Sequence, residues 1–94
     1  MIISSEAEDD LADARRWYDR QRDGLGTDFV ECVEKTFQKV AALPEVHEPV
    51  YQDVRRAVVR RFPYIVYYRL VDGEVVVIAV MHGRRHQRHW QSRI

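Results

Sequence analysis

Disulfides, membrane-spanning segments and flexible linkers are what this sequence lacks. Cys32 is the one cysteine among 94 residues, which excludes an internal disulfide. The longest uninterrupted apolar run, from Val75 to Met81, is far too short to cross a bilayer. The N-terminal stretch turns acidic after Ser5, which is not typical of a signal peptide. We therefore expect one domain of residues 1–94, in the cytoplasm and without membrane association.

A net charge of one sign is also lacking, but the charge is divided between the two halves of the chain. Residues 1–49 hold 12 Asp or Glu against 6 Lys or Arg, whereas residues 50–94 hold 3 against 9. The basic residues of the second half are all arginine, whose planar set of donors suits phosphate or carboxylate. Such a division indicates either an interaction surface or an acidic half that neutralises the basic half within the fold.

Glycine and proline are few, and they separate two helical patterns. Apolar residues recur at helical spacing over about 5–21 and again over about 26–43. Gly24 and Gly26 interrupt the pattern between them, and Pro44 follows the end of the second. The short connection predicts an antiparallel helix hairpin.

Beyond Pro44 the apolar residues no longer follow a helical period. Runs rich in β-branched and aromatic residues at about 54–61, 64–71 and 74–81 each predict a strand. Asp72-Gly73, between the last two runs, predicts a type I′ hairpin turn. Residues 44–53 are predicted to form a connecting loop.

The hairpin turn fixes the expected pairing of the last two strands. The pairs on one face are Leu70 with Val75, Tyr68 with Val77, Val66 with Ala79, and Tyr64 with Met81. We place this apolar face against the helix hairpin, which gives an α+β domain with a small antiparallel β-sheet. The other face is mostly apolar but carries Arg69 and His82, so the tail or a partner should cover part of it.

The stretch HGRRHQRHW at residues 82–90 opens a basic C-terminal tail, predicted at 82–94. Its three histidines suggest a metal, but no Asp, Glu or Cys lies nearby and the arginines would repel a cation, so we expect none. Arginines beside an aromatic residue can instead bind phosphates and stack on bases. The alternative is a tail that folds back and buries Trp90 on the apolar sheet face.

Two stretches of the chain resemble the RelE/ParE superfamily, the toxins of bacterial type II toxin–antitoxin modules that include plasmid stabilisation proteins. SSEAEDDLADARRWYDRQRDGLGTDF, at residues 4–29, is similar to the family's first helix and the turn after it. RRFPYIVYYRLVDGEVVVIAVMHGRRHQRHW, at residues 60–90, is similar to its closing hairpin and tail. The resemblance covers most of the chain, and it implies the fold predicted above.

This resemblance leaves two activities open. RelE-like members cleave mRNA on the ribosome without a metal, whereas ParE-like members poison DNA gyrase. The cleavage needs basic groups and a proton donor around the phosphate, and one arginine of the RelE set aligns with Ile65, which cannot serve. The chain is therefore closer to the ParE-like branch. If it is a metal-independent endoribonuclease, the candidate catalytic residues are Arg60, Arg85, His86 and His89.

We therefore expect a toxin that binds a gyrase-like target, forms a hetero-oligomer with a cognate antitoxin that neutralises it, and uses no cofactor. The alternatives are a ribosome-dependent mRNA interferase and a non-toxic relative that binds only its antitoxin or nucleic acid. The predicted target-binding residues are Arg55, Arg69, His82, Arg84, Arg85, Arg88 and Trp90. The predicted antitoxin-binding residues are Trp17, Tyr67 and Ile78.

Overall fold

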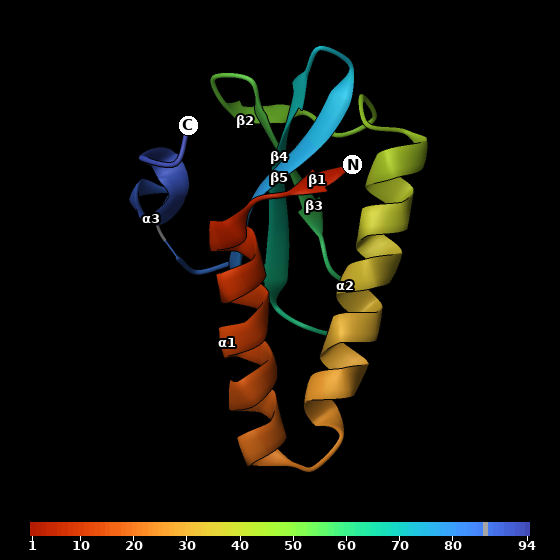
Figure 1. Ribbon diagram of the computed structural model, residues 1–94, viewed down its shortest axis with the longest axis vertical. Coiled ribbons are helices and arrows are strands. Elements are labelled where there is room, and N and C mark those ends of the chain that lie inside the picture. Colours follow the sequence, from red (N-terminus) through yellow and green to blue (C-terminus); the bar gives the residue numbers. More distant parts are fainter. Residues whose placement is uncertain (86) are drawn as a thin grey trace.

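A computed structural model describes residues 1–85 and 87–94 and confirms the α+β architecture (Figure 1). Helices α1 (Ser5–Gln21) and α2 (Leu25–Ala42) form the predicted hairpin and pack against one face of the sheet. Within the described residues, five strands form one sheet in the order β1-β5-β4-β3-β2. The strands are β1 (Ile2–Ile3), β2 (Pro49–Tyr51), β3 (Val54–Val58), β4 (Tyr64–Val71) and β5 (Glu74–His82). A short helix, α3 (Arg88–Gln91), lies near the C-terminus.

Two segments before β4 differ from the sequence-based prediction. Residues 44–53, predicted as a loop, contain β2, which pairs antiparallel with β3 and forms one edge of the sheet. The strand predicted at 54–61 ends at Val58, and Arg61 takes a left-handed backbone conformation with φ of 72°. That conformation turns the chain out of the extended path a strand requires.

The helix hairpin depends on a close approach at Gly26. A Cβ atom at this position would lie 2.5 Å from the backbone oxygen of Arg15. The backbone N–H of Gly26 donates to the Asp19 carboxylate over 2.8 Å. Glycine is therefore needed where α2 meets the end of α1, because any side chain would push the two helices apart.

Aromatic rings join the hairpin to the sheet. Tyr18 of α1 and Phe29 of α2 lie 5.1 Å apart between ring centroids. Both rings contact Phe62 and Tyr64, with centroid distances from 4.9 to 5.9 Å. Contacts of this geometry stabilise beyond the burial of their area, and they fix α1 and α2 against the start of β4.

The β4–β5 hairpin follows the prediction near its turn and departs from it farther on. Asp72 and Gly73 have φ of 50° and 78°, as a type I′ turn requires. Leu70 pairs with Val75 and Tyr68 with Val77, as predicted. A β-bulge then shifts the register, so the remaining two predicted pairings are wrong. The observed pairs beyond the bulge are Tyr67 with Ala79, Val66 with Val80, Ile65 with Met81, and Tyr64 with His82.

The bulge leaves Ile78 as an extra residue on β5, and distant side chains satisfy the backbone around it. The Asp10 carboxylate accepts a hydrogen bond from the Val80 N–H over 3.0 Å. Arg93 donates to the Ile78 carbonyl over 3.0 Å and to Asp10 over 2.7 Å. These partners replace hydrogen bonds that a bulge disrupts. As a result, Val80 joins the core beneath the helices, and His82 lies on the same side, opposite Tyr64.

The C-terminal residues fold back over the other face of the sheet. Trp90 is 1% exposed and stacks on Tyr67, with ring centroids 4.5 Å apart. Tyr67 and Ile78 are buried in the same cluster. The expectation that these three residues offer a surface to a target or antitoxin is therefore wrong for this conformation, because the chain's own tail covers the apolar face.

Candidate functional site

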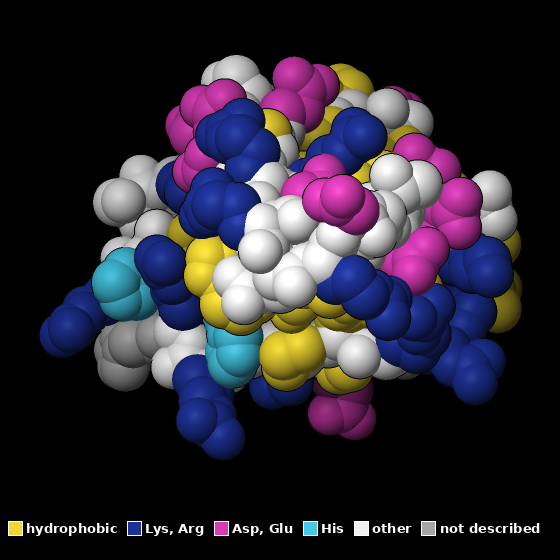
Figure 2. All heavy atoms as spheres, turned by 90° about the horizontal axis from the view of Figure 1, so that it is seen from below, with side chains coloured by type: hydrophobic (Ala, Val, Ile, Leu, Met, Phe, Trp, Pro, Cys, Tyr) yellow, Lys and Arg dark blue, Asp and Glu magenta, His cyan; other side chains and the backbone are white. Residues whose placement is uncertain are grey.

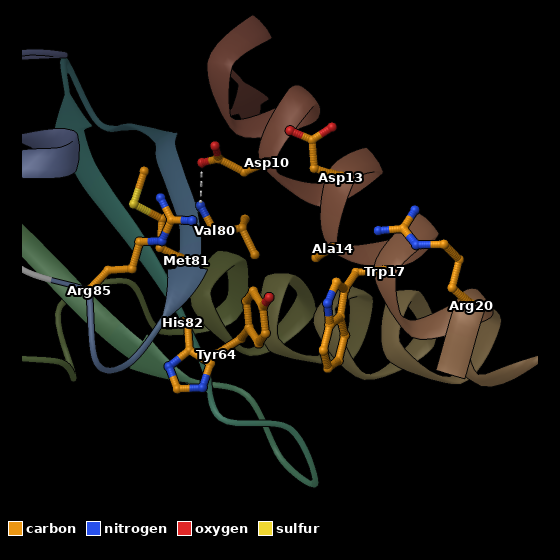
Figure 3. Close-up of a pocket in the computed structure, with 10 residues that line it drawn as sticks. All are labelled: Asp10, Asp13, Ala14, Trp17, Arg20, Tyr64, Val80, Met81, His82 and Arg85. Atoms are coloured by element: carbon orange, nitrogen blue, oxygen red, sulfur yellow. Dashed lines mark hydrogen bonds between the residues drawn. The ribbon is translucent and has the colours of Figure 1, made fainter. Parts of the chain in front are cut away.

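Two adjoining hollows form a groove between α1 and the end of β5, which we call the α1–β5 groove. Their volumes are about 320 and 960 Å³. The first is bounded by side chains of α1 on one side and of β5 on the other, as Figure 3 shows. The residues that line both hollows are Trp17, Tyr64, His82 and Arg85. The second hollow extends toward the tail and is also lined by Arg84, Arg88 and His89.

A tight turn after β5 presents the arginines to the groove. The Gly83 N–H donates to the Pro63 carbonyl over 2.8 Å, and the Arg85 N–H donates to the His82 carbonyl over 2.9 Å. The Nδ1 atom of His82 accepts from the Arg84 N–H over 3.0 Å. These bonds hold the backbone of 82–85, while the side chains of Arg84 and Arg85 stay exposed. Two guanidinium groups are thus carried on an ordered turn.

A row of aromatic rings runs along the floor of the groove. Neighbouring centroids lie 5.0 Å apart from Trp17 to Tyr18, 5.9 Å from Tyr18 to Tyr64, and 5.6 Å from Tyr64 to His82. Trp17 is 49% exposed, whereas Tyr18 is buried. Burial raises the pKa of Tyr64 above its ordinary value, although the nearby positive charge of Arg85 lowers it in part. The Tyr64 hydroxyl is therefore a neutral hydrogen-bond donor near pH 7.

Positive charge gathers at the tail end of the groove. In Figure 2, Lys and Arg side chains project beside the histidines on one side of the molecule. The acids at the other end of the groove are already engaged: Asp10 with Arg93, and Asp13 with Arg16. No ion pair among the described residues involves Arg84 or Arg85, so the groove offers positive charge and an aromatic floor, which suits an anionic partner with flat or apolar groups.

The groove brings together a part of the predicted site residues. Trp17, His82, Arg84, Arg85 and Arg88 all line it, as does His89 of the alternative nuclease set. His86 lies outside the described residues.

The other predicted arginines lie elsewhere and have structural partners. Arg55 donates to the backbone carbonyls of Glu45 and His47. Arg69 pairs with Asp53 through three hydrogen bonds, near the turn end of β4 and away from the groove. Both were predicted to bind a target, and the structure instead uses them to hold the 45–53 segment.

Sequence reasoning missed Tyr64 as a groove residue, because its pairing across the hairpin was predicted one position too early. The register shift places His82, and not Met81, opposite Tyr64. The sequence does hold one signal for this site: His82 ends an apolar run, and a histidine is less easily buried than its apolar neighbours. No local sequence pattern predicts that Asp10 and Arg93 stabilise the bulge.

The described residues contain no cluster of metal ligands and no membrane-spanning helix. Among residues 1–85 and 87–94, no group of three or more His, Cys, Asp or Glu side chains could hold a metal ion. In the same part of the chain, no helix has the length and apolar character needed to cross a bilayer.

The family model for the ParE toxin of type II toxin–antitoxin systems (parDE) matches residues 1–87. The chain belongs to this family. The matched region includes α1, the whole sheet and the turn that bears Arg84 and Arg85, and therefore most residues that line the α1–β5 groove.

Individual ParE proteins agree with this assignment. Toxin ParE2 of Mycobacterium tuberculosis, found in two strains, is 32% identical over 85 residues, which cover 86% of this chain and 78% of the relative. A solved structure titled "Chromosomal ParDE TA system from P. aeruginosa" matches with a TM-score of 0.65 at 17% identity. That match covers 87% of this chain and 95% of the other, and it shows a shared fold.

Proposed function

We propose that this ParE toxin arrests bacterial growth by binding DNA gyrase through the α1–β5 groove, and that a cognate antitoxin neutralises it in the cytoplasm. The observation that carries the proposal is the pair of exposed arginines, Arg84 and Arg85, held on an ordered turn beside His82. A hydrogen-bonded backbone that carries exposed charged side chains favours binding, because little backbone entropy is lost when a partner docks.

The arrangement of the candidate nuclease residues favours binding over cleavage. Arg60 lines a separate hollow beside α2 that shares no residue with the groove. Ile65 is 4% exposed and packs under the tail, so its position supplies no cation to a phosphate. Phosphoryl chemistry requires its charged groups at one point, and Arg60 and Arg85 do not meet there.

One observation keeps mRNA cleavage as a second candidate. Tyr64, His82 and Arg85 line the same hollow, and they supply a neutral hydroxyl, an imidazole and a guanidinium. Such groups could move a proton and stabilise a phosphate in metal-independent RNA cleavage. The two candidates predict different products, so one set of assays separates them.

The antitoxin is proposed to engage the open side of the groove. Trp17 is the large aromatic side chain that stands half-exposed there, and half-exposed tryptophans often anchor protein interfaces. The surrounding arginines favour an acidic, amphipathic segment that orders on binding. Because Tyr67 and Ile78 are covered by the tail, we no longer assign them to this contact.

The decisive experiment compares two double variants during induced expression in a bacterial host. Arg84→Ala with Arg85→Ala should abolish growth arrest, because both cations on the turn after β5 are lost. Arg15→Ala with Arg56→Ala removes the same charge from exposed positions outside the groove and should leave arrest unchanged. Both proteins should bind the antitoxin within about tenfold of the parent, since the proposed anchor, Trp17, is retained. Growth arrest by a folded Arg84/Arg85 variant would contradict the assignment.

Purified protein then identifies the target. Inhibition of gyrase supercoiling with intact mRNA supports the proposal. Cleavage of mRNA in a translation assay, lost in Tyr64→Phe or His82→Ala, would replace it with the nuclease candidate. Absence of arrest from the parent chain would leave a non-toxic relative that binds its antitoxin.

A further inference from the structure

A further hollow, which we call the α2 hollow, lies beside α2 and apart from the α1–β5 groove. It has a volume of about 740 Å³ and is bounded by one face of α2 and by the connection between β3 and β4. None of its lining residues lines the groove. The function proposed above makes no use of it.

The floor of this hollow is small and nearly neutral. Its lining includes the small, uncharged side chains Cys32, Thr36 and Ala42, which their spacing places on one face of α2. The Thr36 hydroxyl donates to the Cys32 carbonyl over 3.2 Å, so its hydrogen atom is already used within the helix. These small side chains leave room above the helix for a ligand.

The rim is strongly cationic. Lys35 and Lys39 stand one helical turn apart on α2, and Arg60 and Arg61 face them from the β3–β4 connection. Figure 2 shows a second group of Lys and Arg side chains on the side of the molecule away from the histidines. Within the described residues, the ion pairs include Arg61 with Asp28 at 3.8 Å but none of Lys35, Lys39 or Arg60. Three exposed cations thus line one hollow, and their combined positive potential favours binding of an anion.

The backbone of the β3–β4 connection adds an independent observation. Arg61 has φ of 72°, in the left-handed region, which residues other than Gly, Asn and Asp rarely adopt. Its guanidinium lies 5.5 Å from the centre of the Phe62 ring. Backbone strain of this kind costs about 1–2 kcal/mol and is concentrated at functional sites. A glycine would relieve the strain, yet the chain keeps an arginine that points to the rim.

We propose that the α2 hollow binds a phosphate ester, either a free nucleotide or the backbone of a nucleic-acid strand. Lysines supply compact charges and arginines supply planar donors, and phosphate accepts both. The volume is that of a small-ligand site and admits one nucleotide. Carboxylates of an acidic peptide pair with the same cations, so a poly-glutamate peptide is the comparison that distinguishes the two ligand classes.

The test measures binding of ATP and of a labelled 12-nucleotide DNA strand to the purified chain at low salt. Inorganic phosphate and a poly-glutamate peptide serve as comparison ligands. The site variant carries Lys35→Ala, Lys39→Ala and Arg60→Ala. The matched control carries Arg15→Ala, Arg16→Ala and Arg56→Ala, which removes the same charge from exposed positions outside the groove and the α2 hollow. A charge-conserving variant exchanges Lys35 and Lys39 for Arg and Arg60 for Lys, and circular dichroism confirms folding of each.

The expected result is loss of nucleotide or strand affinity by about tenfold or more in the site variant, since each charge-assisted contact contributes at least a few-fold. The control and the charge-conserving variant should bind like the parent. Tighter binding of the strand than of ATP would assign the site to a nucleic-acid backbone, and the reverse to a free nucleotide. Equal loss in the site variant and the control, no binding by the parent, or preference for poly-glutamate would overturn the proposal. Growth arrest is not a readout here, so failure of this site leaves the toxin proposal intact.

Discussion

The two faces of the sheet are covered in different ways. Helices of 17 and 18 residues and a four-ring aromatic cluster bury one face. The indole of Trp90, on a helix of four residues, is the centre of the cover on the other. Its Nε1 atom is buried without a hydrogen-bond partner among the described residues, and an unmade buried bond costs about 1–3 kcal/mol.

An ion pair anchors the tail cover near the C-terminus. Arg93 joins the tail to Asp10 of α1 and to the bulge of β5. A short, terminally anchored element opens at a lower free energy than the whole domain unfolds. We therefore expect the helix face to determine the global stability of the domain. We expect the tail face to open locally, at a lower free energy.

The largest effect is expected on the helix face. Phe29→Ala should lower the free energy of unfolding by about 3–5 kcal/mol, because it leaves a cavity in the fully buried aromatic cluster. Urea denaturation followed by circular dichroism measures the change. A loss below about 1 kcal/mol would mean that this face does not determine stability.

A smaller effect is expected on the tail face. Trp90→Ala should cost about 2 kcal/mol, the value of burying one large apolar side chain, because the tail can detach while the helix face persists. Hydrogen exchange should become faster at the backbone of α3 and remain slow in α2. Trp90→Phe is the control: it keeps a ring and removes the unpaired N–H, so it should restore most of the stability. Equal losses from Phe29→Ala and Trp90→Ala would break the comparison.

The smallest effect concerns alkaline pH. Burial raises the pKa of Tyr18, Tyr64 and Tyr68, all on the helix face, above the ordinary value of 10.0. The unfolded chain therefore loses these protons at a lower pH than the folded chain does. Their contribution to stability is fully present below about pH 10 and is lost as the pH rises above it.

Tyr64→Phe removes one of these groups. Its free energy of unfolding should fall less steeply than that of the parent between about pH 9 and 11, as urea titrations at each pH would measure. Identical slopes for the two proteins would show that Tyr64 does not contribute to the alkaline loss.

Much of the site could be predicted because its residues adjoin local signals. Arg84 and Arg85 follow the end of a strongly patterned strand, and Trp17 lies on a regular helix, so their nearness to one another follows once the two elements pack. The edge strand β2 could not be predicted in the same way. It has three residues, begins with a proline and depends on its pairing with β3.

The sequence by itself determined the two helices, the three longer strands and the Asp72-Gly73 turn, because periodicity and turn chemistry act between near neighbours. Only the tertiary structure decided the bulge at Ile78 and the burial of Trp90. The run from Val75 to Met81 is apolar at every position, so no alternation marks where its register shifts. The shift is stabilised by Asp10, 70 residues before Val80, and by Arg93 near the C-terminus. Because these partners meet only in the folded chain, the pairing of His82 with Tyr64, and with it the form of the groove, is a property of the whole domain.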